Sequence, residues 1–159
     1  MTDLRVANRF FGYEIQRHPN GGYSLNQRTH IDNMLQLFQM VNAYTKIIPA
    51  DPHVNLSKYA DIDKPIDQRH HPSITASLSY APLGTRPGIA SIVANLAQYN
   101  TDPRSVHLMA AKRVLQYLKK TENLRLHFKP NPSDSNPSNS PLIRYTDADR
   151  GKARAFGHQ

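Results

Sequence analysis

An amphipathic run in the second half of the chain constrains the fold more than any other feature. Asp102 and Pro103 are typical of a helix start, because Asp accepts hydrogen bonds from free backbone amides and Pro suits the first turn. Apolar residues then recur at helical spacing and line one side of the predicted helix. They are Val106, Met109, Ala110, Val114, Tyr117 and Leu118. We therefore expect one long helix with a buried face.

Positive charge is concentrated in the same region. The 159 residues carry 20 Lys and Arg against 12 Asp and Glu, a net charge of +8. Between residues 68 and 121 the only acid is Asp102, against seven cations, Arg69, Arg86, Arg104, Lys112, Arg113, Lys119 and Lys120. Such a field attracts polyanions, since each cation that meets a phosphate releases a counterion. A solvated face, with cations placed to suit the helix dipole, explains the same residues without a ligand.

The N-terminal segment predicts a β-hairpin followed by a helix. Residues 10–15 read as one strand, and Tyr23 and Leu25 belong to a second, with a tight turn over residues 18–22. Thr29 and Asp32 resemble a capping box with Asp in place of Glu. The helix then has one apolar face, formed by Ile31, Met34, Leu35, Leu37, Phe38 and Val41.

Prolines indicate where helices and connecting segments begin in the rest of the chain. Residues 48–72 contain four of them and predict extended connecting chain. Helical spacing resumes at Ile74 and Leu78, is interrupted by residues 82–84, and restarts at Pro87, which suits a first helical position. Residues 124–128 predict a short strand, 129–141 a Pro-, Ser- and Asn-rich linker, and 142–147 a final strand. The expected fold class is α+β.

Several classes of protein are disfavoured. No apolar run is long enough to cross a bilayer, and the first residues lack a signal-peptide core, so we expect an intracellular, unsecreted chain. There is no Cys, so thiolate zinc sites and thiol nucleophiles are excluded. The adjacent His70 and His71 read as loop residues. Asp147 and Asp149 could face one Mg²⁺ from a strand end, but ordinary strand-end carboxylates are the simpler interpretation.

Eight short motifs in order resemble one family. They are Met1-Thr-Asp-Leu4, Phe10-Phe-Gly-Tyr-Glu-Ile15, Gly22-Tyr-Ser-Leu-Asn-Gln27, His30-Ile-Asp-Asn-Met-Leu35, Ser77-Leu-Ser-Tyr80, Leu83-Gly-Thr-Arg-Pro-Gly-Ile-Ala90, the run from His107 to Lys119, and Tyr145-Thr-Asp-Ala-Asp149. Together they resemble the end of the reverse transcriptase, running into ribonuclease H, of a copia-type retrotransposon Pol polyprotein. The match covers nearly the whole chain.

The resemblance implies a set of parts. Residues 1–47 would be a primer-grip-like hairpin and thumb helix, and 48–72 an extended connecting segment. Residues 73–128 would be the helical connection with a short strand, 129–141 a linker, and 142–159 the truncated start of a ribonuclease H-like domain. The implied partners are a primer–template duplex of RNA and DNA and the remainder of the polyprotein, with no membrane.

The resemblance also assigns site residues. Phe10, Gly12 and Tyr13 would contact nucleic acid from the hairpin. In the helical region, the candidate phosphate contacts are Arg104, Lys112, Arg113, Lys119 and Lys120. Asp147 matches the first metal-binding carboxylate of ribonuclease H, and with Asp149 it would form an incomplete Mg²⁺ site.

The chain departs from the family pattern where catalysis would occur. It contains no adjacent Asp-Asp pair, which the family's polymerase site uses to hold Mg²⁺. Gly88 and Arg150 stand where Asp and Trp are usual, and Phe11 and Pro82 where Leu or Met is commoner. We therefore expect no tightly bound Mg²⁺ and no activity of the chain alone. A residual nucleic-acid-binding module and an inert remnant of a decayed element are the alternatives.

Overall fold

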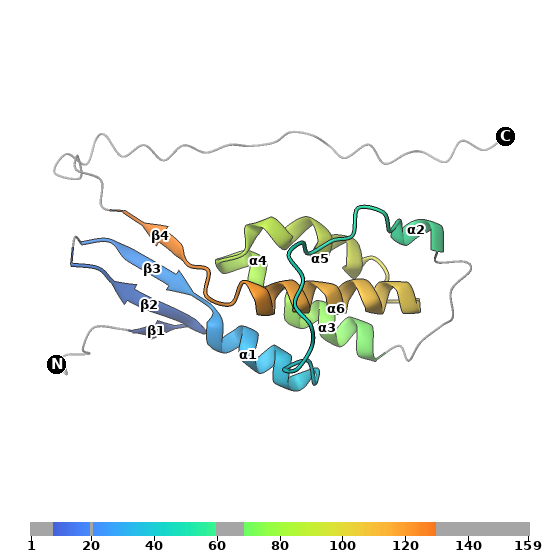
Figure 1. Ribbon diagram of the computed structural model, residues 1–159, viewed down its shortest axis with the longest axis horizontal. Helices are drawn as coiled ribbons and strands as arrows, with labels where there is room; N and C mark the ends of the chain where they lie inside the picture. The colour runs from blue at the N-terminus through green and yellow to red at the C-terminus, as the bar shows by residue number, and fades with distance from the viewer. Residues whose placement is uncertain (1–7, 20, 60–68, 130–159) are drawn as a thin grey trace. The chain divides into compact units, whose positions relative to one another are not determined.

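The computed structural model describes residues 8–19, 21–59 and 69–129. The chain divides into two compact units, residues 1–129 and 130–159, and all the described residues belong to the first. The expected final strand, with Asp147 and Asp149, lies outside the described residues, as does the expected linker beyond Lys129. The helices and strands of the first unit are labelled in Figure 1.

The described residues form a mixed structure of strands and helices, which confirms the α+β class. The strands are β1 (Arg9–Phe10), β2 (Tyr13–Arg17), β3 (Tyr23–Asn26) and β4 (Leu126–Phe128). The helices are α1 (Arg28–Leu37), α2 (Leu56–Tyr59), α3 (His70–Leu78), α4 (Tyr80–Gly84), the 3-10 helix η1 (Pro87–Ile89), α5 (Ala90–Ala97) and α6 (Ser105–Lys120).

The strands form one antiparallel sheet in the order β1-β2-β3-β4. The predicted β2–β3 hairpin is confirmed, with Ile15 opposite Leu25. The single strand predicted over residues 10–15 is wrong, because Phe11 and Gly12 have φ of 46° and 77° and turn the chain between β1 and β2. The short strand predicted over residues 124–128 is confirmed as β4, which pairs with β3 through Leu25 and Leu126.

Helix α1 differs from its prediction at both ends. Thr29 forms no capping box: its backbone N–H and its hydroxyl both donate to Oε1 of Glu14 on β2. That carboxylate lies at the helix N-terminus, where negative charge is favourable. The helix ends at Leu37, and Gln39 with φ of 55° reverses the chain. Leu37 and Val41, expected to be buried, are therefore 67% and 50% exposed.

Among the described residues between 48 and 97, more are helical than predicted. The short helix α2 lies within the segment expected to be extended, and α3 already begins at His70. Pro82, expected to interrupt the helical spacing, lies inside α4. Pro87 opens η1, and α5 follows from Ala90. The backbone N–H groups in the first turn of a helix have no acceptor within the helix. Pro82 and Pro87 lie in first turns, so the missing N–H of proline costs no helical hydrogen bond there.

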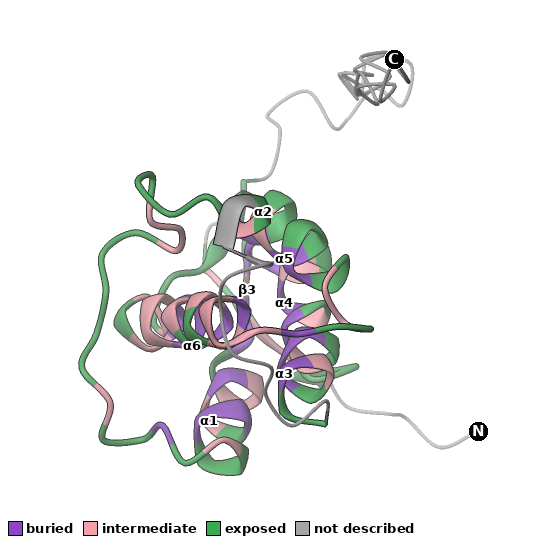
Figure 2. Cartoon of the chain, turned by 90° about the vertical axis from the view of Figure 1, so that its right-hand side faces the viewer, coloured by how far each residue is buried: buried purple, intermediate pink, exposed green. Residues whose placement is uncertain are grey.

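The long helix α6 is the centre of the unit. Only part of its predicted buried face is confirmed, because Val106, Ala110 and Tyr117 are only partly buried. The fully buried apolar residues are the predicted Val114 and Leu118 and the unpredicted Ala111 and Leu115. The core that they share with α1, α3, α4, η1 and α5 also contains Ile31, Met34, Leu35, Met40, Ile74, Leu78, Ala81, Ile89, Val93 and Leu96. In Figure 2 the buried positions of α1, α3 and α6 face the space between these helices. Met109, expected on this face, is 68% exposed.

The start of α6 also differs from its prediction. Asp102 does not cap the helix, which begins at Ser105 with Arg104 as N-cap. The backbone N–H of Arg104 donates to Nδ1 of the buried His107 at 3.0 Å. Asp102 instead forms an ion pair with the Arg104 side chain at 2.9 Å.

Candidate nucleic-acid interface

The outward face of α6 carries most of the candidate phosphate contacts. At 100° per residue, Lys112, Arg113, Lys119 and Lys120 fall within about 120° of the helix circumference. The fully buried Ala111, Val114, Leu115 and Leu118 lie on the other side. The cations therefore project away from the core because the apolar positions fix how the helix is rotated.

A long loop crosses this face. Residues 39–55, which we call the strap, join α1 to α2 and pass over α6 on the side opposite α3 (Figures 1 and 2). The backbone N–H of Lys46 donates to the carbonyl of Gln116 at 3.3 Å. Further along, the carbonyl of Leu56 lies 3.3 Å from Nε2 of His107. The strap thus follows α6 from its C-terminal half toward its N-terminus.

The strap forms polar contacts with two of the candidate cations. Nζ of Lys119 donates to the carbonyl of Ala43 at 2.8 Å. Nη1 of Arg113 lies 3.1 Å from the Asp51 carboxylate, and both side chains are partly shielded from solvent. Arg104 is likewise paired, with Asp102. Each of these three cations already forms a hydrogen bond or an ion pair within the unit.

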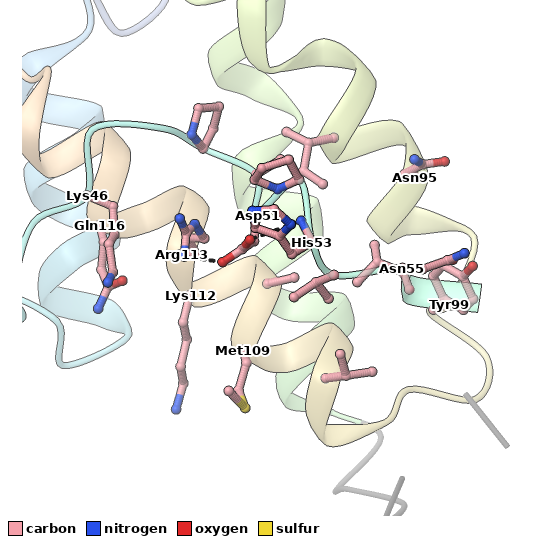
Figure 3. Close-up of a pocket in the computed structure, with 18 of the residues that line it drawn as sticks. Lys46, Asp51, His53, Asn55, Asn95, Tyr99, Met109, Lys112, Arg113 and Gln116 are labelled. Atoms are coloured by element: carbon pink, nitrogen blue, oxygen red, sulfur yellow. Dashed lines mark hydrogen bonds and ion pairs between the residues drawn. The ribbon is translucent and has the colours of Figure 1, made fainter. Parts of the chain in front are cut away.

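Lys112 and Lys120 differ from the other candidates. Both are exposed. Neither side chain forms a hydrogen bond or ion pair with the part of the chain that the structure describes. They lie eight residues apart on α6, a separation of about 12 Å along the helix axis. Gln116 lies midway between them, beside Lys46 (Figure 3).

Arg86 is not part of this surface, although it adds to the basic charge of the region. It is 4% exposed. Its guanidinium donates to the carbonyls of Thr121 at 2.8 Å and Leu124 at 3.0 Å, and to the carbonyl of Thr85 at 3.0 Å. Burial lowers the pKa of Arg86. Its role is to join the end of α6, and the approach to β4, to the α4–η1 corner.

A pocket of about 940 Å³ lies beneath the strap, between it and helices α5 and α6 (Figure 3). Its polar lining includes Lys46, Lys112 and the Asp51–Arg113 pair, and its apolar lining includes Ile92 and Val106. Lys112 points out from the rim in Figure 3. The sequence carries no signal for the pocket, because the segment that closes it has no periodic pattern.

The three hairpin candidates divide into exposed and packed residues. Phe10 is 60% exposed, and its neighbour Phe11, which is not a candidate, is 77% exposed. Tyr13 packs against Tyr80, with ring centroids 5.6 Å apart, and its ring covers Gly84. Burial and the hydrogen bond with Tyr80 raise the pKa of Tyr13. Gly12 lies beside the same Tyr80 ring, at the turn where the chain needs a positive φ.

Two histidines of the helical region are buried in the core. His71, expected in a loop, lies in α3 and is fully buried, as is His107 of α6. Their rings are 6.1 Å apart, and the Tyr99 ring stacks on His107 at 3.9 Å. Burial, and then the proximity of His107, lower the pKa of His71. Among the described residues, no group of three His or acidic side chains is placed to hold a metal ion.

Comparisons with known proteins give the family. The chain is 35% identical over 94% of its length to the retrovirus-related Pol polyprotein from transposon RE1 of Arabidopsis thaliana, of which it covers 10%. It is 31% identical over 94% of its length to that from transposon TNT 1-94 of Nicotiana tabacum, covering 11%. A putative transposon Ty5-1 protein of Saccharomyces cerevisiae is 26% identical over 99% of the chain, which covers 49% of it.

The chain therefore belongs with transposon-encoded proteins, to which it is similar over most of its length. More particularly, the chain is homologous to a segment of the Pol polyproteins of copia-type retrotransposons, which confirms the resemblance found in its motifs. It spans about a tenth of the length of the first two relatives. No family model and no solved structure matches it. Within the described residues, no helix is long and apolar enough to span a bilayer.

Proposed function

We propose that this segment holds a primer–template duplex within the reverse transcriptase part of a Pol polyprotein, through the outward face of α6. The observation that carries the proposal is the pair Lys112 and Lys120, exposed and unpaired among the described residues on a helix without any acidic residue. Two cations about 12 Å apart on a rigid helix can contact phosphates of one backbone without reorganisation. The relatives' polyprotein context supports nucleic acid as the polyanion.

We propose that the chain alone catalyses no reaction. Two-metal phosphoryl transfer needs several carboxylates that converge on Mg²⁺. The sequence has no Asp-Asp pair, and Asp147 and Asp149 lie outside the described residues. We therefore propose that catalysis depends on other parts of the polyprotein, and that this segment contributes binding.

Binding and activity are tested separately. Fluorescence anisotropy with a labelled RNA/DNA duplex should show binding at low salt that weakens as salt rises. The double variant Lys112→Ala/Lys120→Ala should bind several-fold more weakly. Arg9→Ala/Lys129→Ala is the matched control and should bind nearly as well as the parent, because it removes two exposed cations away from α6, one in β1 and one directly after β4. Labelled nucleotide should not be incorporated on a primed RNA template.

Two results would overturn the proposal. One is the absence of duplex binding at low salt by a chain that unfolds cooperatively, which would favour an inert remnant. The other is an equal loss of binding in the two double variants, which would mean that net charge alone, and not the face of α6, determines the affinity.

A further inference from the structure

The pocket beneath the strap has one charged end and one uncharged end. Its α6 side runs from Val106 to Gln116, which is about 15 Å of helix axis. Figure 3 shows Lys46 and Gln116 together at one end, and Tyr99 at the other. Tyr99 stacks on His107, which fixes that end beside the start of α6. The Lys, Arg and Asp residues of the lining all lie toward Gln116.

The charged end has two ammonium groups more than the local acid can neutralise. Among the described lining residues the one acid is Asp51, which is paired with Arg113 at 3.1 Å. Lys46 and Lys112 are both exposed. Neither of their side chains forms a hydrogen bond or ion pair within the described ranges. This end of the pocket therefore carries two uncompensated positive charges and attracts an anionic group.

The rest of the lining is mainly apolar, and part of it remains in contact with water. It includes Pro49, Val54, Leu56, Ile92, Val106 and Met109. Val54 is 39% exposed and Met109 is 68% exposed. A ligand that covers such side chains gains free energy from the apolar surface removed from water. The volume of about 940 Å³ is within the usual range for small-molecule sites.

We propose that this pocket binds an amphipathic monoanion, an alkyl chain of medium length that ends in a carboxylate. The carboxylate pairs with Lys46 and Lys112, whose flexible stems let the ammonium groups reach it. The alkyl chain then lies along α6 toward Val106, where the lining is uncharged. A cationic head on the same chain would meet two positive charges. The inference goes beyond the proposed function and does not depend on it.

Calorimetric titration of the full chain with dodecanoate, kept below its micelle concentration, tests the proposal. We expect one saturable site. Hexanoate should bind at least about tenfold more weakly because it buries fewer methylene groups, and dodecyltrimethylammonium should not bind. Lys46→Gln/Lys112→Gln should weaken dodecanoate binding about fivefold, the usual scale for two exposed ion pairs. Arg9→Gln/Lys129→Gln, which removes two exposed cations outside the pocket, should leave the affinity unchanged.

A second measurement locates the ligand. The chain contains no Cys, so a single introduced thiol reports on its own surroundings. Val54 lines the pocket, whereas Val41 lies on the strap outside it and has a similar exposure of 50%. Saturating dodecanoate should slow the reaction of the Val54→Cys variant with iodoacetamide several-fold. The Val41→Cys variant is the matched control, and its reaction rate should not change.

Four results would overturn the inference. They are the absence of saturable dodecanoate binding, equally tight binding of dodecyltrimethylammonium, equal dodecanoate affinity of the two double variants, and equal protection of the two thiols. The last would indicate adsorption over the whole surface. None of these measurements includes nucleic acid, so failure of the duplex to bind would contradict the proposed function alone.

Discussion

Oδ2 of Asp51 lies 3.1 Å from Nη1 of Arg113, so a carboxylate of the strap is paired with one of the cations of α6. The pair joins two segments about 60 residues apart in the chain. It neutralises one of the candidate contacts and leaves Lys112, one residue away, exposed. The strap therefore determines which cations of the helix are available to a polyanion.

Removing this carboxylate should strengthen nucleic-acid binding. Asp51→Asn frees the Arg113 guanidinium, and a partly exposed ion pair contributes at most about 1 kcal/mol, so the affinity for duplex should rise by up to about fivefold. The matched control is Asp32→Asn, which changes the net charge equally but removes an acid of α1 that lies 3.8 Å from Arg28. Anisotropy titrations of both variants make the comparison. An equal gain in the control would show that net charge alone is responsible.

Arg86 should be needed for stability and not for binding. Arg86→Lys keeps the charge but cannot reproduce the planar fork that reaches Thr121 and Leu124 together. Leaving those carbonyls without their donors should lower the free energy of unfolding by about 2–4 kcal/mol. Urea unfolding followed by circular dichroism measures this. A loss below about 0.5 kcal/mol, the scale of ordinary surface changes, would contradict the role assigned to Arg86.

Two glycines offer a test of how the hairpin packs on the helices. A Cβ at Gly84 would overlap the ring of Tyr13, whereas a Cβ at Gly88 would meet nothing within 4 Å. Gly84→Ala should therefore destabilise the unit by about 1–3 kcal/mol, the usual cost of overpacking. Gly88→Ala should be nearly neutral. Adding Tyr13→Ala to Gly84→Ala should make the two changes non-additive, and simple additivity in thermal unfolding would contradict the contact.

Stability should fall as the solution becomes acidic. Burial lowers the pKa values of His71 and His30 below the ordinary 6.5, so both are neutral in the folded chain when they would already be protonated in the unfolded chain. The unfolded state then binds more protons, and the free energy of unfolding decreases as pH falls below about 6.5. His71→Leu should flatten this slope in urea titrations at pH 7.5, 6.5 and 5.5. The control is the exposed neighbour His70→Leu, and an equal flattening there would contradict the assignment.

Local patterns predicted the elements better than their boundaries and contacts. The apolar spacing of α6 predicted the helix, since helical periodicity is local information. It identified the buried Val114 and Leu118 but not the equally buried Ala111 and Leu115. The break at Phe11 and the end of α1 at Gln39 were missed because non-glycine residues there adopt positive φ, which sequence patterns seldom indicate. The capping of Thr29 by Glu14 was missed because its acceptor comes from another strand.

In the candidate site, too, the sequence predicted the residue types better than their contacts. Charge counting found Lys112 and Lys120, but it could not separate them from Arg86, which is buried, or from Arg113, which is paired. That separation depends on the strap and on burial, which arise from contacts distant in sequence. The motifs identified the family because they preserve order along the chain, which needs no three-dimensional information.

The salt dependence of duplex binding tests the central claim most directly. On B-form DNA, the slope of log affinity against log salt is about −0.9 for each phosphate neutralised. If Lys112 and Lys120 each contact one phosphate, Lys112→Ala/Lys120→Ala should make the slope shallower by about 1.8, while Arg9→Ala/Lys129→Ala leaves it unchanged. A slope in the α6 double variant equal to that of the parent chain would mean that nucleic acid does not lie on this face of the helix.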